Sequence, residues 1–284
     1  MTLDDRFNTI STIIESCYQG INSQGTGFFY QETSNPDPSQ TGPHWEIVKG
    51  LYLITNRHIL LIKDENGNEQ IPDTFTFYLR QLTGNKIEWF PVKLDSNDLK
   101  QRAKVHVDKR IDIAAISILD LVTKFISDPN NRLANWTAVN ENELPSKNKI
   151  HIEVSDEAIV LGYPKGFYDR MNLFPIVKSG IIASRWGANF SGNPYFLIDS
   201  KLFPGSSGSL VISRPINHVI ENGKQFYSKE KKFAFLGVYS GEPYFESNPI
   251  EFDDFTITRK EGFNVGIVWY SYLVVDIVKN GISI

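Results

Sequence analysis

The sequence is poor in cysteine, and this sets a first limit on its chemistry. Its 284 residues include one cysteine, Cys17, so no disulfide can form within the chain. Secreted proteins commonly carry disulfides, whereas the cytosol keeps thiols reduced. The opening residues lack a basic start followed by an apolar run, so we expect no secretory leader. These two features together predict a cytoplasmic protein.

The chain also lacks a strong charge of either sign and a long apolar run. Its formal net charge of −4 gives no basic field, so we expect no nucleic-acid partner. The most apolar stretches, such as residues 270–278 with Asp276 inside, are too short for a membrane span, and we expect no membrane contact. No His-Glu-x-x-His motif or paired-cysteine spacing is present, and we expect no metal and no cofactor.

Short strand-like segments bounded by turn residues fill most of the chain. This pattern favours an all-β barrel or sandwich over a parallel α/β sheet. Residues 3–16 place apolar side chains at three- and four-residue steps and predict an N-terminal helix. Residues 271–279 predict a closing C-terminal helix in the same way. Residues 121–144 are richer in Asn, Asp and helix-compatible residues, and predict a crossover between two β units.

Three short segments carry candidate catalytic groups in the order His, Asp, Ser. An ITNRH segment ends in His58 after an apolar strand, an RIDIA segment holds Asp112 among apolar neighbours, and an FPGSSGS segment contains Ser207. A carboxylate among apolar residues is costly unless it is paired, and an imidazole N–H is a suitable partner. A serine hydroxyl needs a neighbouring base to remove its proton. We therefore predict a triad with Ser207 as nucleophile, His58 as base and Asp112 orienting the imidazole.

Glycines flank the candidate nucleophile. Gly205 and Gly208 permit backbone conformations closed to other residues, so the amides of Gly205 and Ser207 can converge on one point. Such donors stabilise the oxyanion of a tetrahedral intermediate. We place the oxyanion hole at Gly205, Ser206 and Ser207. A segment of this kind alone is more typical of a surface turn, and it is the other two segments that favour catalysis.

The order of the three segments argues against another class of serine hydrolase. An α/β-hydrolase carries its acid and then its histidine downstream of the serine. Only His218 follows Ser207 here, and no acidic residue lies between them. The α/β-hydrolase arrangement is therefore not met.

Taken together, the segments resemble the chymotrypsin/trypsin double β-barrel peptidases, and bacterial members in particular. Those members often read Thr-Asn-x-His at the base and Pro-Gly-x-Ser-Gly at the nucleophile, as ITNRH and FPGSSG do here. The segment VLGYPKG is similar to the family's turn that opens the second barrel. The resemblance implies an all-β fold of two packed six-stranded antiparallel β-barrels, with an N-terminal and a C-terminal helix.

The resemblance also implies a domain organisation. Residues 1–284 are expected to form one trypsin-like unit. The N-terminal barrel is expected at about 17–120, the crossover at about 121–145, and the C-terminal barrel with its closing helix at about 146–284. No length remains in this sequence for a PDZ module, so we expect none.

The activity implied by the resemblance is that of a serine endopeptidase, which hydrolyses protein or peptide substrates through an acyl-enzyme. Substrate-binding residues are expected at Lys201, Ser240, Gly241 and Glu242. Lys201 stands where trypsin keeps its basic-selective aspartate, so we do not predict cleavage after Lys or Arg. Ser206 replaces the aspartate that captures the new N-terminus in animal trypsins, and activation by that salt bridge is not expected.

Two other functions use the same segments. A catalytically silent trypsin-fold binding or scaffold protein would keep the fold without the chemistry. A small-molecule esterase would share every catalytic residue. An unrestricted cytosolic protease would threaten its host, so we also expect its activity to be held back by a regulatory protein partner, an occluding loop or narrow specificity.

Overall fold

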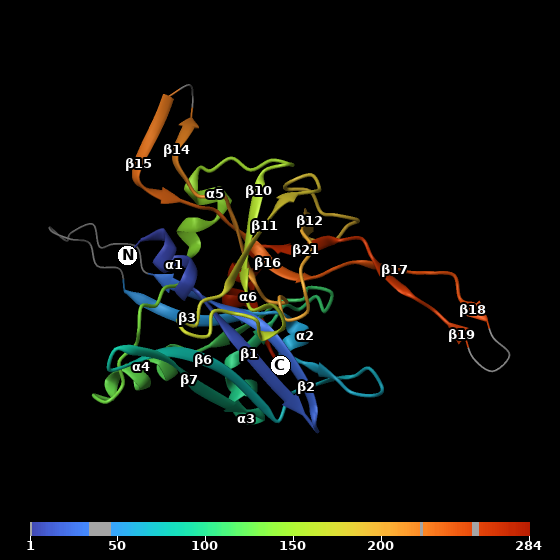
Figure 1. Cartoon of the computed structure of the whole chain (residues 1–284), viewed down its shortest axis with the longest axis horizontal. Helices are drawn as coiled ribbons and strands as arrows, with labels where there is room; N and C mark the ends of the chain where they lie inside the picture. The colour runs from blue at the N-terminus through green and yellow to red at the C-terminus, as the bar shows by residue number, and fades with distance from the viewer. Residues whose placement is uncertain (1, 34–46, 222–223, 252–255) are drawn as a thin grey trace.

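The N-terminal half of the molecule, together with the last strand of the chain, forms an eight-stranded antiparallel sheet (Figure 1). The computed structural model describes residues 2–33, 47–221, 224–251 and 256–284. The strand order of the sheet is β22-β8-β9-β3-β2-β1-β6-β7. Its strands are β1 (Ser11–Tyr18), β2 (Ile21–Thr33), β3 (Val48–Thr55), β6 (Thr74–Thr83), β7 (Lys86–Asp95), β8 (Ala103–Val105), β9 (Ala114–Ser117) and β22 (Ile282–Ser283).

The C-terminal half forms a closed barrel, in the order β10-β11-β12-β21-β16-β13. Its strands are β10 (Glu157–Gly162), β11 (Ile176–Ile182), β12 (Tyr195–Asp199), β13 (Leu210–Ser213), β16 (Phe235–Gly241) and β21 (Val265–Tyr270). The buried patterns of β10 and β13 explain why these segments close on one another, because nearly all their side chains avoid water. The predicted second six-stranded barrel is therefore present.

The predicted first six-stranded barrel is not found as such, because the N-terminal strands form an open sheet. β8 is three residues long and pairs with β9 on one side and with the C-terminal strand β22 on the other. Its outer edge is thereby occupied by β22 and is not free to meet β7. The last residues of the chain thus complete the sheet built by the first half, and this pairing was not predicted.

The predicted N-terminal helix is only half correct. Helix α1 (Leu3–Thr9) begins at a capping box on Thr2 and ends well before residue 16, because β1 starts at Ser11. The segment after Thr9 is rich in β-branched residues, which favour strands, and Ile14 pairs with Gly25 and Phe77 on either side. The predicted C-terminal helix is present as α6 (Tyr272–Asn280), with its apolar face buried.

The remaining elements are short helices and hairpins. Two hairpins extend from the barrel in Figure 1, one formed by β14 and β15 and the other, longer one by β17 to β20. None of the helices in the described residues is long and apolar enough to cross a membrane. The other helices are α2 (Arg57–Leu60), α3 (Ser96–Arg102), α4 (Leu119–Ser127), α5 (Pro145–Asn148), η1 (Glu141–Glu143) and η2 (Pro164–Gly166). The other strands are β4 (Ile62–Lys63), β5 (Glu69–Gln70), β14 (Ile216–Glu221), β15 (Lys224–Lys232), β17 (Tyr244–Glu246), β18 (Ile250–Glu251), β19 (Thr256–Ile257) and β20 (Lys260–Gly262).

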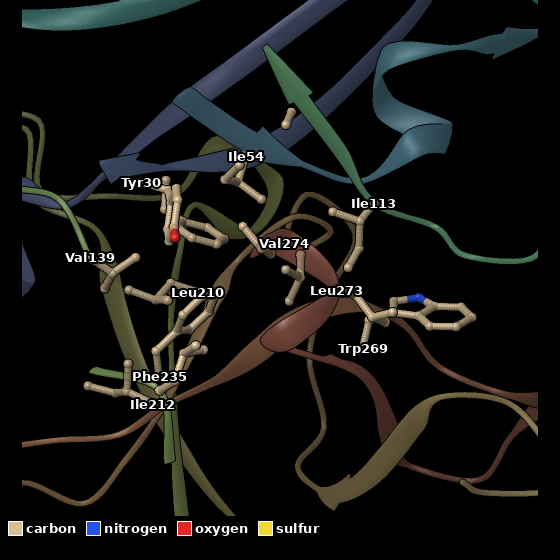
Figure 2. Close-up of a cluster of buried hydrophobic side chains, with 14 of the residues drawn as sticks. Tyr30, Ile54, Ile113, Val139, Leu210, Ile212, Phe235, Trp269, Leu273 and Val274 are labelled. Carbon is tan, nitrogen blue, oxygen red and sulfur yellow. The ribbon is translucent and has the colours of Figure 1, made fainter. Parts of the chain in front are cut away.

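A shared hydrophobic core joins the sheet to the barrel. Side chains from the sheet, including Tyr30 and Ile54, pack with Leu210 and Phe235 of the barrel and with Val274 of α6 (Figure 2). Apolar burial contributes roughly 25 cal/mol per Å², and the close packing of these side chains fixes how the two units sit on each other. The candidate catalytic segments lie on either side of this joint.

Candidate active site

His58 lies just beyond the end of β3, where the chain leaves the sheet. β3 ends at Thr55, Asn56 precedes α2, and His58 is the second residue of that short helix. The Asn56 side chain does not cap α2; its amide instead donates to the backbone oxygen of Asp112 at 2.6 Å. A buried residue between strand and helix thus ties the histidine segment to the aspartate segment.

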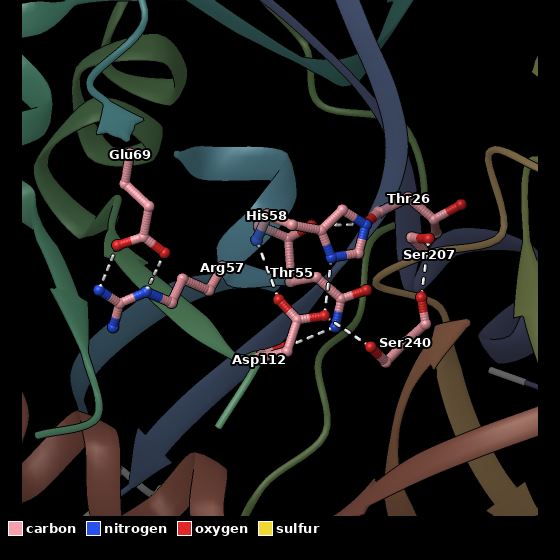
Figure 3. Close-up of polar contacts among 9 residues, drawn as sticks. Thr26, Thr55, Arg57, His58, Glu69, Asp112, Ser207 and Ser240 are labelled. Carbon is pink, nitrogen blue, oxygen red and sulfur yellow. Dashed lines mark hydrogen bonds and ion pairs between the residues drawn. The ribbon is translucent and has the colours of Figure 1, made fainter. Parts of the chain in front are cut away.

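Asp112 lies in the segment between β8 and β9 and accepts three hydrogen bonds through its carboxylate. The backbone N–H of His58 donates to Oδ1 at 2.9 Å, and Nδ1 of the imidazole lies 2.7 Å from Oδ2. The hydroxyl of Ser240 donates to the same Oδ2 at 2.5 Å (Figure 3). A carboxylate on Nδ1 selects the tautomer that carries its proton there and leaves Nε2 as an acceptor. This is the orientation that a general base requires.

Ser207 lies on the turn before β13. Its hydroxyl donates to the backbone oxygen of Ser240 at 2.9 Å, and Ser240 in turn bonds Asp112. Figure 3 shows the imidazole of His58 between the Asp112 carboxylate and the side of the site where Ser207 lies. Within the described residues no hydrogen bond joins His58 to Ser207. The structure thus brings all three predicted triad residues into one network, with Ser240 as the link to the serine.

Hydrogen bonds fix most peptide groups of the Ser207 turn. The backbone oxygen of Pro204 accepts from Lys165 N–H at 2.7 Å, and that of Ser206 accepts from Ser209 N–H at 3.0 Å. A trans peptide points its C=O and N–H in opposite directions. The N–H of Gly205 therefore points away from Lys165, and the N–H of Ser207 points away from Ser209.

The same turn leaves two donors open. In the part of the chain that the structure describes, nothing accepts a hydrogen bond from the N–H of Gly205 or Ser207. The N–H of Ser206, by contrast, donates to the backbone oxygen of Phe203 at 3.0 Å. Of the three residues predicted for the oxyanion hole, Gly205 and Ser207 offer free donors and Ser206 does not.

Glycine is required at two places in this turn. Gly205 has φ +89° and Gly208 has φ +85°, both in the left-handed region. A Cβ added to Gly205 would stand 2.6 Å from the backbone nitrogen of Lys165, and one added to Gly208 would clash with the backbone oxygen of Thr26. The turn can therefore form only with these glycines.

A family model described as a trypsin-like peptidase domain matches residues 25–220, which is more than half of the chain. The protein belongs to the trypsin-like peptidase family. No curated protein matches the sequence. A peptidase family implies protein substrates.

Solved peptidase structures are similar to this chain at low identity. The protease Anisep from Arthrobacter nicotinovorans is 12% identical over 93% of this chain and 91% of its own, with a TM-score of 0.41. A thermostable serine protease from an extremophilic microorganism is 11% identical over 96% and 99%, with a TM-score of 0.43. The tobacco etch virus protease is 11% identical over 99% and 82%, with a TM-score of 0.46.

The four residues predicted to bind substrate occupy different environments in this trypsin-like peptidase. Gly241 ends β16, and a Cβ added there would meet nothing within 4 Å. The Glu242 carboxylate accepts from the backbone N–H of Asn264, and the backbone oxygen of the exposed Lys201 accepts from the Lys178 ammonium. The hydroxyl of Ser240 is engaged by Asp112, as described above. The substrate-binding assignment stays a prediction.

Sequence reasoning missed an ion pair that anchors the histidine helix. The guanidinium of Arg57 donates to the Glu69 carboxylate of β5 at 2.8 and 2.6 Å, and its side chain is only 8% exposed. These hydrogen bonds and the charge of Arg57 lower the pKa of Glu69. An arginine beside His58 at the end of an apolar strand was the available signal, because a nearly buried guanidinium requires a partner.

Proposed function

We propose that this protein is a serine endopeptidase that cleaves peptide bonds with Ser207, His58 and Asp112. The observation that carries the proposal is the double contact of Asp112 with the backbone and the Nδ1 of His58. A carboxylate held in this way sets the tautomer of the base and stabilises the imidazolium that forms. Two free amides beside the serine hydroxyl add the donors that acyl transfer needs.

The chemistry follows two balanced steps. Nε2 of His58 takes the proton of the Ser207 hydroxyl as its oxygen bonds to the scissile carbonyl carbon, and the same proton then passes to the leaving amine as the C–N bond breaks. Water next attacks the acyl carbon and gives one proton to His58. His58 then returns that proton to the Ser207 oxygen as the ester bond breaks. Throughout, the amides of Gly205 and Ser207 stabilise the oxyanion, and Asp112 stays ionised.

The proposed reaction requires the Ser207 hydroxyl to turn from Ser240 toward His58. It now donates to the backbone oxygen of Ser240. A serine χ1 has three staggered positions, and rotation between them is fast on an enzymatic timescale. Catalytic hydrogen bonds are often loose before substrate binds, so this arrangement is compatible with a working triad.

A second candidate is a catalytically silent trypsin-fold binding or scaffold protein. The bond from Ser207 to Ser240 in place of His58 is the observation that favours it. In that case the serine would be held as a donor to a carbonyl and would not be deprotonated. An esterase acting at the same site is a third candidate, and only the substrate distinguishes it from the peptidase.

We extend the proposal to the cellular location of the protein and to its partners. The half-buried Cys17 is the chain's single cysteine and suits a reducing compartment, so we propose a cytoplasmic peptidase. We also propose that a regulatory protein restrains it, since the exposed His58 leaves the base open to solvent.

Labelling with a fluorophosphonate tests the proposal. Such reagents react with a serine only when a base and an oxyanion hole activate it. We expect an adduct on Ser207 at neutral pH, located by peptide mass spectrometry, and none in Ser207→Ala. Absence of the adduct in the unaltered protein would favour the scaffold. Cleavage of a protein such as casein, compared with cleavage of a simple ester, then distinguishes peptidase from esterase.

A further inference from the structure

Thr26 of β2 lies beneath the Ser207 turn and belongs to none of the groups assigned to catalysis so far. It is fully buried in the eight-stranded sheet, at 0% exposure. We propose that Thr26 is a positioning residue that holds the oxyanion donors of the neighbouring barrel in their working orientation. This inference rests on the proposed function, because only a turn used in acyl transfer needs its amides fixed.

Every polar atom of Thr26 takes part in a hydrogen bond to another segment of the site. Its N–H donates to the backbone oxygen of Ser207 at 2.8 Å, and its hydroxyl donates to that of Gly205 at 2.9 Å. The hydroxyl also accepts from the N–H of Tyr163 at 2.9 Å. The backbone oxygen of Thr26 accepts from the hydroxyl of Thr55 at 2.8 Å (Figure 3).

These contacts decide the orientation of the peptide that follows Gly205. Glycine has no side chain to restrict its rotation, so its peptide planes depend on hydrogen bonds. Among the described residues, the Thr26 hydroxyl is the one group that donates to the Gly205 oxygen. The Gly205–Ser206 peptide carries the N–H of Ser206, which donates to Phe203, and the Thr26 N–H likewise holds the oxygen of the Ser207–Gly208 peptide. The Ser206–Ser207 peptide between them carries the free N–H of Ser207, so loss of the Thr26 hydroxyl loosens one of its two flanking peptides and lets that N–H shift. The N–H that is expected to donate to the oxyanion would then no longer point toward it.

Thr26 also connects the two halves of the site. Thr55 ends β3, directly before Asn56 and His58, whereas Gly205 and Ser207 belong to the barrel. A single buried residue thus bonds the strand that carries the base and the turn that carries the nucleophile. The sequence signal was a threonine between Gly25 and Gly27, which by itself also fits an ordinary strand.

Thr12 offers a matched control within the same sheet. It is also a fully buried threonine, and its hydroxyl both donates to the backbone oxygen of Tyr78 at 2.7 Å and accepts from the N–H of Tyr78 at 3.1 Å. Its hydroxyl therefore makes the same pair of bonds as that of Thr26, but to β6 and not to the nucleophile turn. Removing either hydroxyl should cost similar stability.

The test compares Thr26→Val, Thr26→Ser and Thr12→Val. For each variant we would measure the rate constant of fluorophosphonate labelling at Ser207, kcat and KM on one peptide substrate, and Tm. Loss of one oxyanion donor costs about 100- to 1,000-fold, so a misdirected donor in Thr26→Val should slow labelling and kcat by roughly 10- to 100-fold, with KM little changed. Thr26→Ser keeps the hydroxyl and should stay within about threefold of the unaltered protein, as should Thr12→Val.

The outcomes separate this inference from the proposed function. If the unaltered protein is labelled and Thr26→Val reacts as fast as Thr12→Val, the positioning role is wrong and hydrolysis stands. If the unaltered protein is not labelled at Ser207, both fail. If Thr26→Val does not fold, Thr26→Cys replaces it, since a thiol is a weak donor. Slower labelling in Thr26→Cys than in Thr26→Ser then supports the role, and equal labelling contradicts it.

Discussion

The barrel and the sheet differ in how they are closed, and they contribute different parts to the site. The barrel has no free strand edge, whereas the sheet has β22 and β7 at its two edges. The barrel carries Ser207 and the free amides, which must not move relative to one another. The sheet carries His58 in the helix that follows β3, and Asp112 in the segment between the short strands β8 and β9. The closed unit thus holds the proposed oxyanion donors, and the open unit holds the proposed proton-transfer pair.

The two units are joined at the site by polar contacts as well as by the core. Ser240 of the barrel bonds Asp112 of the sheet. Farther away, Arg80 of β6 reaches the barrel side, where its guanidinium donates to the Tyr163 hydroxyl at 2.6 Å and to the backbone oxygen of Leu173 at 2.7 Å. Each of these contacts can be removed singly, which allows the contributions of the two units to be separated.

The largest effect is expected from removing one catalytic group from each unit. Because the residues of the proposed triad would act as one device, Ser207→Ala and His58→Ala should each lower kcat by about a millionfold, and the double variant should lose little more. Steady-state kinetics on one peptide substrate measures this. Losses that multiply in the double variant would show that the two units do not act together.

Asp112→Asn should cost less, at about 10,000-fold in kcat, because the amide favours the wrong tautomer of His58 while the geometry persists. The circular dichroism spectrum should stay unchanged. A variant that folds normally and keeps full turnover would remove Asp112 from the proposed mechanism.

A change in the barrel turn alone should follow in size. Gly205→Ala meets both a positive φ and the backbone of Lys165, so it should displace one oxyanion donor and lower kcat by about 100- to 1,000-fold. Gly67→Ala is the matched control, since Gly67 has φ +81° and open space around it, in a turn away from the site. Equal losses of kcat in the two variants would point to general strain.

Arg80 tests the joint between the units through stability. It is 4% exposed, burial lowers its pKa, and within the described residues no carboxylate pairs with it. Arg80→Met removes the guanidinium that donates to the buried Tyr163 hydroxyl and Leu173 carbonyl, and should lower the free energy of unfolding by about 2 to 4 kcal/mol, measured in urea. Arg102→Met, which removes a surface pair with Asp120, should cost about 1 kcal/mol or less. If Arg80→Met lowered the free energy of unfolding no more than Arg102→Met does, the role of Arg80 at the joint would be contradicted.

The smallest effect is expected at Ser240. Ser240→Ala removes one of the three hydrogen bonds to the Asp112 carboxylate, which corresponds to about 1 to 1.5 kcal/mol or roughly tenfold in kcat. A change confined to KM would instead support the substrate-binding role predicted for Ser240. Kinetics at several substrate concentrations separates the two.

Many of the strands and helices could be predicted from local sequence patterns, but the long-range pairing that completes the sheet could not. Runs of β-branched and apolar residues predicted the strands, and the spacing of Leu273, Val274 and Ile277 predicted α6. The same spacing misplaced the end of α1, because Ile13 and Ile14 suit a buried strand as well as a helix. The pairing of β22 with β8 joins residues far apart in the chain, and no local pattern predicts such a contact.

The sequence by itself determined which groups are available: the order of His58, Asp112 and Ser207, and glycines at positions where only glycine is tolerated. These are properties of single side chains and of local backbone sterics, so each can be inferred from a residue and its neighbours in the sequence. Only the tertiary structure decided that Ser240 holds Asp112, that Thr26 holds Gly205, and that Ser206 has no free amide. Those assignments depend on hydrogen-bond directions between distant segments, which are set when the sheet and the barrel pack together.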